Sequence, residues 1–366
     1  MINEYTELIK RIESSKRLYI YGAGIVGYGV YKAVQTMFNR EVVSFIVSDI
    51  KNNPTEYAGM PVISFLKYIK IHETEDLILV ATPPEYHNEI VQMLVNNNMK
   101  EYILITPGLE YCLIGQYLKQ HFNITCIEDV ICSNNTIPTG CKVFMAVSNN
   151  DKELINHYTE ENYVTKIQVG KECTQLLHND AEIYDNEGDN ISVRNPLYGE
   201  LTATYNVWKN HSHDIMGIFH YRRVIDVKIE QLSVFNNNID VILPLPFVCY
   251  PDASGQYGRY LSDEDVDIMK AVLYEYHPEL KELIIKALNS QILYNYNMLI
   301  AKREVFNDYC EWIFPLLEEI TNRCESYNRE RLSRYVGRIG EILTSLYFTI
   351  NTRNWNVAHA PKIWRV

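Results

Sequence analysis

A glycine-rich turn near the start of the chain constrains its fold more than any other feature. The sequence Gly22-Ala23-Gly24-Ile25-Val26-Gly27 directly follows the apolar run 17–21 and opens a helical pattern that continues to about residue 37. The first glycine permits a tight turn, the second lets a pyrophosphate approach the backbone, and the third lets helix and strand pack closely. A strand, a glycine turn and a helix in this order predict the first unit of a parallel, Rossmann-like sheet.

Further apolar runs at 42–47, 77–82 and 102–106 alternate with helical patterns, which predicts a small α/β domain over residues 1–108. Asp49 ends the second run, at the distance from the glycines where a ribose-binding acid is expected. Gly22, Gly24, Gly27 and Asp49 are therefore candidates for binding NAD(P) or another nucleotide. The alternative is a domain that keeps its glycines for packing and binds nothing, since a fold does not imply a function.

Residues 109–140 are less regular and contain the turn-rich string SNNTIPTG, so we expect a linker there. A second domain is expected over residues 141–366, where strands and helices alternate again. Its expected strands lie at 142–147, 165–169, 214–219, 240–243 and 298–301, and its expected helices at 199–209, 262–288, 303–321 and 330–348.

Charge and composition exclude several classes of protein. The net charge is −12, the opposite of the basic surplus expected of a nucleic-acid binder. No apolar run approaches the roughly 20 residues of a membrane span, and the polar N-terminus lacks the apolar core of a secretory signal. Eight cysteines occur without zinc-ligand spacing. We expect a cytoplasmic protein, with peripheral contact at the inner face of the membrane as an alternative.

From about residue 142 to the end, which is over half of the chain, the sequence resembles a known protein family. Seven blocks carry this resemblance and stand in family order. They are KIQVGKE (166–172), DNEGDNISVRN (185–195), ELTATYNVWKN (200–210), DIMGIFHYRR (214–223), DVILPLP (240–246), YNYNMLIAKREVFNDYCEWIFPLL (294–317) and RIGEILTSLY (338–347). In these blocks the second domain resembles the bacterial glycosyltransferase family catalogued as DUF4422, which is found in capsule and exopolysaccharide gene clusters. The resemblance implies a GT-A-like fold behind the Rossmann-like domain, and transfer of a sugar from a nucleotide donor.

Two positions depart from the family pattern. The first strand of the second domain ends in Val147-Ser148-Asn149-Asn150 instead of a His-Lys type of sequence. The late Gly-Glu-Arg-Leu pattern reads Gly340-Glu341-Ile342-Leu343, so an arginine is lost while the glutamate stays.

Sugar transfer requires the developing charge of the diphosphate to be neutralised. Many GT-A enzymes use a DxD motif and a metal ion after a buried strand, where this chain has His220-Tyr221-Arg222-Arg223. Arginine forks suit phosphate, so Arg222 and Arg223 are predicted to bind the donor. A structural ion pair, for instance with Glu200 or Asp226, is the alternative. Divalent metal (Mn or Mg) is disfavoured, and no metal ligands are assigned.

The strings Asp263-Glu264-Asp265 and Asp265-Val266-Asp267 match DxD literally, but Ser262 and Asp265 form a capping signature at a helix start. We therefore predict that these acids cap a helix. Asp185, Glu187 and Asp189 lie in a polar loop and are either donor or metal contacts, or turn formers.

Glu341 is the predicted general base, because Gly340 permits close approach and the resemblance places an acid there; a surface or capping glutamate is the alternative. His220 can donate to phosphate or act as a base instead. Asn295 and Asn297 are expected in the sugar pocket. The resemblance adds weaker donor-binding candidates: Lys166, Gln168, Asp189, Asn190, Asn195 and Lys209.

These observations predict an inverting glycosyltransferase that moves a sugar, galactose or galactofuranose as first guess, from a UDP-sugar. The expected acceptor is a saccharide or lipid-linked saccharide of a capsular polysaccharide or exopolysaccharide. Two alternatives stay open: a non-catalytic nucleotide-binding scaffold of polysaccharide assembly, and an NAD(P)-dependent sugar-modifying enzyme that uses the N-terminal domain. Homo-oligomers are compatible with the sequence, and a nucleic-acid partner is not expected.

Overall fold

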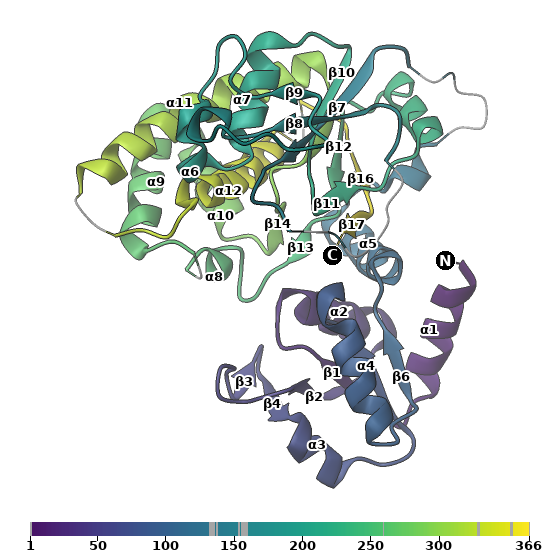
Figure 1. Ribbon diagram of the computed structural model, residues 1–366. Helices are drawn as coiled ribbons and strands as arrows, with labels where there is room; N and C mark the ends of the chain where they lie inside the picture. Colours follow the sequence, from purple (N-terminus) through teal and green to yellow (C-terminus); the bar gives the residue numbers. More distant parts are fainter. Residues whose placement is uncertain are drawn as a thin grey trace. The chain divides into compact units, whose positions relative to one another are not determined.

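A computed structural model describes residues 2–131, 136, 138–152, 154, 160–258, 260–327, 330–351 and 354–365 (Figure 1). The chain forms two compact units. The N-terminal unit comprises Met1–Ile124 together with Phe247–Pro251, and the C-terminal unit comprises Thr125–Pro246 and Asp252–Arg365. Both units are mixed α/β structures with parallel strands, which confirms the fold class that the sequence predicts.

The N-terminal unit is built on a six-stranded sheet of order β3-β4-β2-β1-β5-β6. From β4 to β6 all neighbouring strands are parallel, and only the short hairpin of β3 with β4 is antiparallel. The strands are β1 (Arg17–Tyr21), β2 (Val42–Val47), β3 (Glu56–Tyr57), β4 (Met60–Ser64), β5 (Asp76–Val80) and β6 (Tyr102–Leu104). The helices are α1 (Ile2–Ser14), α2 (Ile25–Phe38), α3 (Phe65–Ile71), α4 (His87–Asn96) and α5 (Pro107–Phe122).

The expected linker at 109–140 differs from the structure, because its first part is helical. Helix α5 belongs to the N-terminal unit and packs against α2, where Gly29 meets the side chain of Ile114. Thr106 caps α5 by accepting a hydrogen bond from the Leu109 backbone at 3.3 Å, and Pro107 occupies its first turn. Residues 132–135 and 137 of the expected linker lie outside the described residues.

The C-terminal unit contains a mixed sheet of order β16-β12-β15-β10-β7-β8-β9, with β11 and β17 attached beside β10. Strands β7, β8, β9 and β10 are mutually parallel, and β15 runs antiparallel between β10 and β12. The strands of this unit are β7 (Cys141–Val147), β8 (Val164–Gln168), β9 (Ile183–Tyr184), β10 (Ile215–His220), β11 (Arg223–Ile225), β12 (Val241–Pro244), β14 (Ile292–Leu293), β15 (Leu299–Lys302), β16 (Val357–Ala360) and β17 (Lys362–Trp364).

Long helices cover this sheet. Helix α11 packs against strands β10 and β15 and against helices α7, α9 and α12 (Figure 1). The apolar segment 309–317 of α11 is largely buried, as expected of a core helix. The helices are α6 (Asn195–Tyr198), α7 (Leu201–Asn210), α8 (Ser254–Tyr257), α9 (Asp263–Tyr276), α10 (Lys281–Leu288), α11 (Arg303–Ser326) and α12 (Tyr335–Ile350).

The strand order fixes where a ligand can bind. Strand β7 lies between β8 and β10, and the chain leaves it in one direction to β8 and β9 and in the other to β10. In such sheets the connections after the carboxyl ends of the strands diverge and leave a crevice at this switch point. Residues that follow β7 and β10 are therefore placed where α/β proteins bind ligands.

The glycine turn of the N-terminal unit provides a matched pair of substitutions. A Cβ on Gly27 would lie 1.9 Å from the carbonyl oxygen of Gly22, whereas a Cβ on Gly24 would have no atom within 4 Å. We expect Gly27→Ala to destabilise the unit by about 3 kcal/mol, the upper end of overpacking costs, and Gly24→Ala to change it by less than about 0.5 kcal/mol. Hydrogen-exchange protection of β1 and β2, with β7 and β10 as internal references, measures both. Equal protection in the two variants would contradict this account of the turn.

Candidate functional site

His220 ends strand β10 at the switch point and faces a buried carboxylate. Its Nε2 lies 3.5 Å from Oε1 of Glu200, and about 85% of each side chain is buried. Burial lowers the pKa of His220 below its ordinary value, and the negative charge of Glu200 opposes this shift. His220 is therefore neutral near pH 7. If His220 takes up a proton, the carboxylate of Glu200 is positioned to stabilise its charged form.

The side chain of Asn297 holds this carboxylate in place. Its Nδ2 donates to Oε1 of Glu200 at 2.7 Å and to the carbonyl of Gly337 at 3.1 Å. The hydroxyl of Thr344 donates to Oδ1 of Asn297 at 3.1 Å. Asn297 was expected in the sugar pocket; it is 1% exposed and its amide binds the protein itself. It lies at the base of the candidate site, and whether it also contacts a sugar stays a prediction.

Glu341 lies on α12 with 14% of its side chain exposed, and its Oε1 is 3.3 Å from Nη1 of Arg338. Burial raises the pKa of Glu341 to about 7; Arg338 lowers it, and Glu200 raises it further. A carboxylate with this pKa can accept a proton near neutral pH.

The backbone at Tyr296 brings the two titratable groups together. It hydrogen-bonds both Glu341 and His220. Tyr296 has a φ of 83° and Asn297 a φ of 49°, so two consecutive non-glycine residues adopt left-handed conformations. Such conformations are costly and persist where the surroundings over-determine them, often at functional sites. Here they direct the Tyr296 backbone to His220 and Glu341 while Asn297 reaches Glu200.

The two arginines after β10 differ in environment. The guanidinium carbon of Arg223 lies 4.3 Å from the ring centre of Tyr296 and 4.4 Å from that of Trp364, and its buried Nε has no hydrogen-bond partner within the described residues. Arg222 lies beside the ring of Tyr221. Neither forms an ion pair in the part of the chain that the structure describes. Both guanidinium groups therefore keep capacity for an anion.

The ion pairs considered as an alternative for these arginines form with other partners. Glu200 is bound by Asn297 and faces His220, as described above. Asp226 lies 3.4 Å from Nζ of Lys228.

Asn295 is the second asparagine expected in the sugar pocket. Its Oδ1 is buried and has no hydrogen-bond partner among the described residues. A buried acceptor without a partner is unfavourable, so a donor from a bound hydroxyl would satisfy it.

The candidates on β8 have polar partners within the protein. Nζ of Lys166 lies 3.3 Å from Glu160 and 3.4 Å from Asp180. The amide of Gln168 is fully buried, donating to the carbonyl of Leu176 and accepting from the backbone of His178, each at 2.8 Å. These two side chains order the loop that follows β8, and their predicted role in donor binding stays untested.

A fully buried carboxylate organises the polar loop after β9. Asp185 accepts hydrogen bonds from Gly170 N at 2.7 Å, Lys171 N at 3.1 Å, Ser192 Oγ at 2.5 Å and Thr202 Oγ1 at 2.6 Å. A structural role for Asp185 therefore accounts for these contacts, because buried polar groups are stable when they are hydrogen-bonded.

The other candidates in this loop also bind neighbouring chain segments. The amide of Asn190 donates to the carbonyls of Asn186 and Gly188, and Asn195 donates to the carbonyl of Gly199 at 2.8 Å. Asp189 is exposed and accepts from Tyr205 Oη at 3.3 Å.

Lys209 lies on the outer side of α7, where its Nζ is 3.4 Å from the ring centre of Trp208. Among the described residues, no hydrogen bond or ion pair joins Lys209 or the candidates of the polar loop to His220 or Glu341. The structure therefore joins His220, Arg223, Asn297 and Glu341 in one cluster, and leaves the weaker candidates outside it.

In the N-terminal unit the glycine turn has the expected form. Gly22 has a φ of 117°, which favours glycine, and Gly24 is the N-terminal cap of α2 with open space beside it. Asp49 is exposed after β2 and accepts from the backbone of Lys51 at 3.0 Å. The conformation of the turn and the packing of Gly27 require glycines whether or not a nucleotide binds.

The literal DxD strings cap helix α9, as predicted. Ser262 is the N-cap and its hydroxyl accepts from the backbone of Asp265 at 3.2 Å. Asp265 also pairs with Arg331 at 2.8 Å. Within the described ranges, no group of three His, Cys, Asp or Glu side chains could hold a metal ion.

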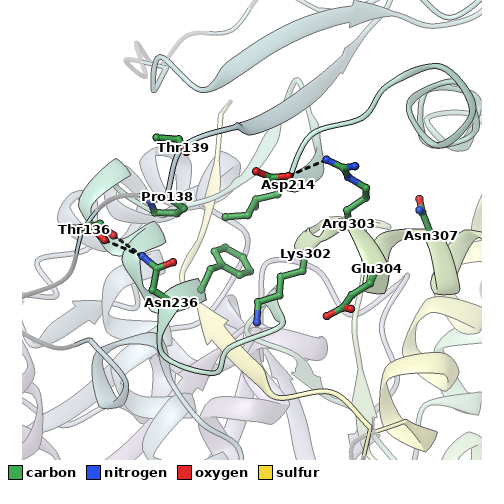
Figure 2. Close-up of a pocket in the computed structure, with 11 residues that line it drawn as sticks. Thr136, Pro138, Thr139, Asp214, Asn236, Lys302, Arg303, Glu304 and Asn307 are labelled. Carbon is green, nitrogen blue, oxygen red and sulfur yellow. Dashed lines mark hydrogen bonds and ion pairs between the residues drawn. The ribbon is translucent and has the colours of Figure 1, made fainter.

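A hollow of about 860 Å³ lies at the opposite end of the sheet (Figure 2). It is lined by residues where β10 begins and β15 ends, and Figure 2 shows Arg303 directed at Asp214 across it, at 2.9 Å. Lys302 is paired with Asp240 at 2.8 Å. Both basic residues of its lining are paired with acids, and the hollow lies away from the carboxyl ends of the parallel strands, so it is the weaker candidate.

Residues 152–352 match the family model described as a domain of unknown function, DUF4422. The match covers more than half of the chain, and the chain belongs to this family. A solved structure, the apo form of the bifunctional glycosyltransferase WbbM, is similar with a TM-score of 0.53 and 22% identity. The likeness covers 62% of this chain and 45% of WbbM, so this chain spans less than half of that protein. At 22% identity, the likeness shows that this chain and WbbM share a fold over the aligned region. No curated protein matches the chain.

Several residues of the cluster were not predicted from the sequence: Glu200, Tyr296, Arg338 and Trp364. The sequence presents Glu200 only as a possible ion-pair partner of the arginines. No local sequence pattern distinguishes a buried acid before α7 from an acid that caps this helix. Asp151, after β7, was also missed. Burial raises its pKa to about 6, and its Oδ2 accepts from Ser148 N at 2.7 Å.

No helix among the described residues is long and apolar enough to cross a membrane.

The burial of Glu341 makes the stability of the protein depend on pH. Between its ordinary pKa of 4.5 and about 7, the folded protein holds a proton that the unfolded chain releases, so stability falls as pH rises through this interval. We expect the free energy of unfolding, relative to the Glu341→Gln variant, to fall by about 3 kcal/mol between pH 4.5 and pH 8.

Chemical denaturation of both proteins at a series of pH values measures this difference. Glu282→Gln, which removes an exposed carboxylate of α10, is the control and should change little. Parallel profiles for the wild type and Glu341→Gln would contradict the burial of a titrating carboxyl at this position.

Proposed function

We propose that this protein is a glycosyltransferase that moves a sugar from a nucleotide-sugar donor to a saccharide acceptor with inversion at the transferred carbon. The observation that carries the proposal is the convergence of Glu341, His220 and Arg223 after the carboxyl end of β10, within the family domain. A proton acceptor with a near-neutral pKa beside free arginine N–H groups is the combination that this reaction requires. The fold shared with WbbM supports the same class of reaction.

In the proposed reaction, Glu341 removes the proton of an acceptor hydroxyl as its oxygen attacks the anomeric carbon. The bond from that carbon to the diphosphate breaks, and the electron pair leaves with the phosphate oxygen. Arg222 and Arg223 neutralise the charge that develops there, because guanidinium groups form paired hydrogen bonds with phosphate. His220, kept neutral by burial, donates to the leaving group or positions it.

The donor is proposed to be a UDP-sugar, with galactose or galactofuranose as the first sugar to test. The acceptor is proposed to be a capsular or exopolysaccharide unit, free or lipid-linked, met on the cytoplasmic side of the membrane. Metal independence is part of the proposal, because arginines stand after β10 where a DxD motif would bind Mn²⁺ or Mg²⁺.

Nucleotide binding by the N-terminal unit is a second candidate function. It is supported by the open space beside Gly24 at the start of α2, where free backbone N–H groups favour an anion. An NAD(P)-dependent reaction would require the ligand to bind there and to be consumed in turnover. Binding without turnover would agree with a sensing role.

We expect UDP-sugars to stabilise the full-length protein by about 2.7 kcal/mol when present at 100 times their dissociation constant. Arg222→Ala should weaken this binding by roughly 10- to 100-fold, because a charge-assisted contact to the diphosphate is lost. Thermal-shift titration with UDP-, GDP-, CMP- and dTDP-sugars and with NAD(P)(H) measures both effects. Arg194→Ala is the matched control, since Arg194 lies on the surface 3.8 Å from Glu318.

Two outcomes would contradict the proposal. Stabilisation by NAD(P) alone would refute the proposed donor class. Turnover that is lost in EDTA and restored by Mn²⁺ would refute metal independence.

The proposed base makes a prediction for kinetics. Glu341→Gln should lower kcat by roughly 10²- to 10⁴-fold, because the proton acceptor is removed while the shape of the side chain is kept. In the wild type, kcat/KM should rise with pH through about 7, since only the ionised carboxylate accepts a proton. Release of UDP in the presence of acceptor, measured from pH 5.5 to 8.5, reports both quantities. Glu282→Gln is again the control, and a flat pH profile together with unchanged kcat in Glu341→Gln would assign the base elsewhere.

A further inference from the structure

The guanidinium of Arg223 lies against two aromatic rings just after the carboxyl end of β10. Its central carbon lies over the ring of Tyr296 at 4.3 Å and over the ring of Trp364 at 4.4 Å, each measured to the ring centre. The two rings are nearly perpendicular, with an interplanar angle of 80° and 5.6 Å between their centres. The guanidinium therefore lies in a corner formed by two ring faces.

Trp364 reaches this corner because strand β17 pairs with the short strand β11. The pairing is antiparallel, and Trp364 is the residue directly opposite Arg223. A backbone hydrogen bond of 2.7 Å from Arg365 N to Arg222 O holds the two strands together at this point. Residues that lie directly opposite each other in an antiparallel pair have side chains on the same face, close enough to touch. The strand pairing therefore specifies the contact between the indole and the guanidinium.

This way of holding an arginine leaves its charge available. A ring face attracts a guanidinium without an acid, whereas a salt bridge would neutralise the charge. Arg331 and Arg303 show the other arrangement, since they pair with Asp265 at 2.8 Å and with Asp214 at 2.9 Å. Arg223 forms no ion pair within the described ranges, and its buried Nε has no hydrogen-bond partner there. Its guanidinium is thus ordered but not neutralised, which is the state that favours an incoming anion.

The same corner adjoins the two groups of the candidate site that can exchange protons. The backbone of Tyr296 hydrogen-bonds both His220 and Glu341. Burial lowers the pKa of His220 and raises the pKa of Glu341, and the positive charge of Arg223 lowers both pKa values. Arg223 is therefore close to both groups, and so is an anion that binds it.

We infer that Trp364 is a positioning residue for the donor diphosphate: together with Tyr296, it holds the guanidinium of Arg223 in place and leaves its charge unpaired for the phosphate oxygens. The inference rests on the proposed function and adds to it a residue that acts through Arg223. Trp364 needs no contact with the ligand for this role. A long side chain that is fixed before the ligand arrives loses less conformational entropy on binding.

The experiment is a double-mutant cycle on the full-length protein, with UDP and inorganic diphosphate as probes in calorimetric titrations. Trp364→Met fills much of the same volume without a ring face, so both probes should bind roughly tenfold more weakly. Trp364→Phe restores a ring face and should bind both probes within about threefold of the wild type. In the Arg223→Ala background, Trp364→Met should cause no further loss, because the residue through which Trp364 acts is absent.

Trp355→Met is the matched control, because it removes the indole that precedes β16. The indole N–H of Trp355 donates to Tyr347 Oη at 3.1 Å. This variant should bind both probes as the wild type does. Thermal unfolding of every variant identifies a loss of fold, and Trp364→Leu replaces Trp364→Met if the latter does not fold.

Unchanged binding of UDP in a folded Trp364→Met or in Arg223→Ala would overturn the inference and leave UDP as the donor nucleotide. An equal further loss on adding Trp364→Met to Arg223→Ala would also overturn it, because Trp364 would then act on the fold or on the ligand directly. If UDP fails to bind while diphosphate binding still depends on both residues, the proposed donor is wrong and the role of Trp364 stands. Binding of neither probe to the wild type would overturn both.

Discussion

The amide of Asn297 is the contact on which the candidate site depends. It joins three segments that are far apart in the sequence: Glu200 before α7, Gly337 in the first turn of α12, and Thr344 two turns later. Helix α12 can approach this closely only because residue 340 is glycine, since a Cβ there would lie 2.6 Å from Leu201 and 3.4 Å from Asn297. One buried amide therefore fixes the carboxylate that faces His220 and the helix that carries Glu341.

Burying two carboxylates in one cluster is costly, and the compensating contacts determine what each can do. Glu200 accepts a hydrogen bond from the Asn297 amide and faces His220. Glu341 has one arginine at 3.3 Å and the backbone of Tyr296, and its pKa remains near 7. The two acids thus have different contacts: Glu200 faces His220, and Glu341 is the group able to exchange a proton near neutral pH.

The sequence alone predicts the elements whose causes are local. The apolar runs and the glycine turn specify the strands and the α/β class, and Ser262 with Asp265 specifies a helix start. The sequence does not predict the contacts between Glu200, His220 and Asn297. These contacts depend on a left-handed turn at Tyr296 and Asn297, a conformation that is unfavourable for a tyrosine. Composition also cannot distinguish Gln168, whose amide orders a loop, from a residue that binds ligand, since both uses need the same polar atoms.

Helix α12 carries the groups that the proposed reaction would have to coordinate. Arg338 and Glu341 are three residues apart on α12, so their side chains are neighbours on the helix surface. Arg338 contacts the ring of Tyr260, and Glu341 belongs to the cluster with His220. Because a helix is stiff, the Asn297 amide that anchors α12 at Gly337 also fixes the position of Glu341, one turn further along the helix.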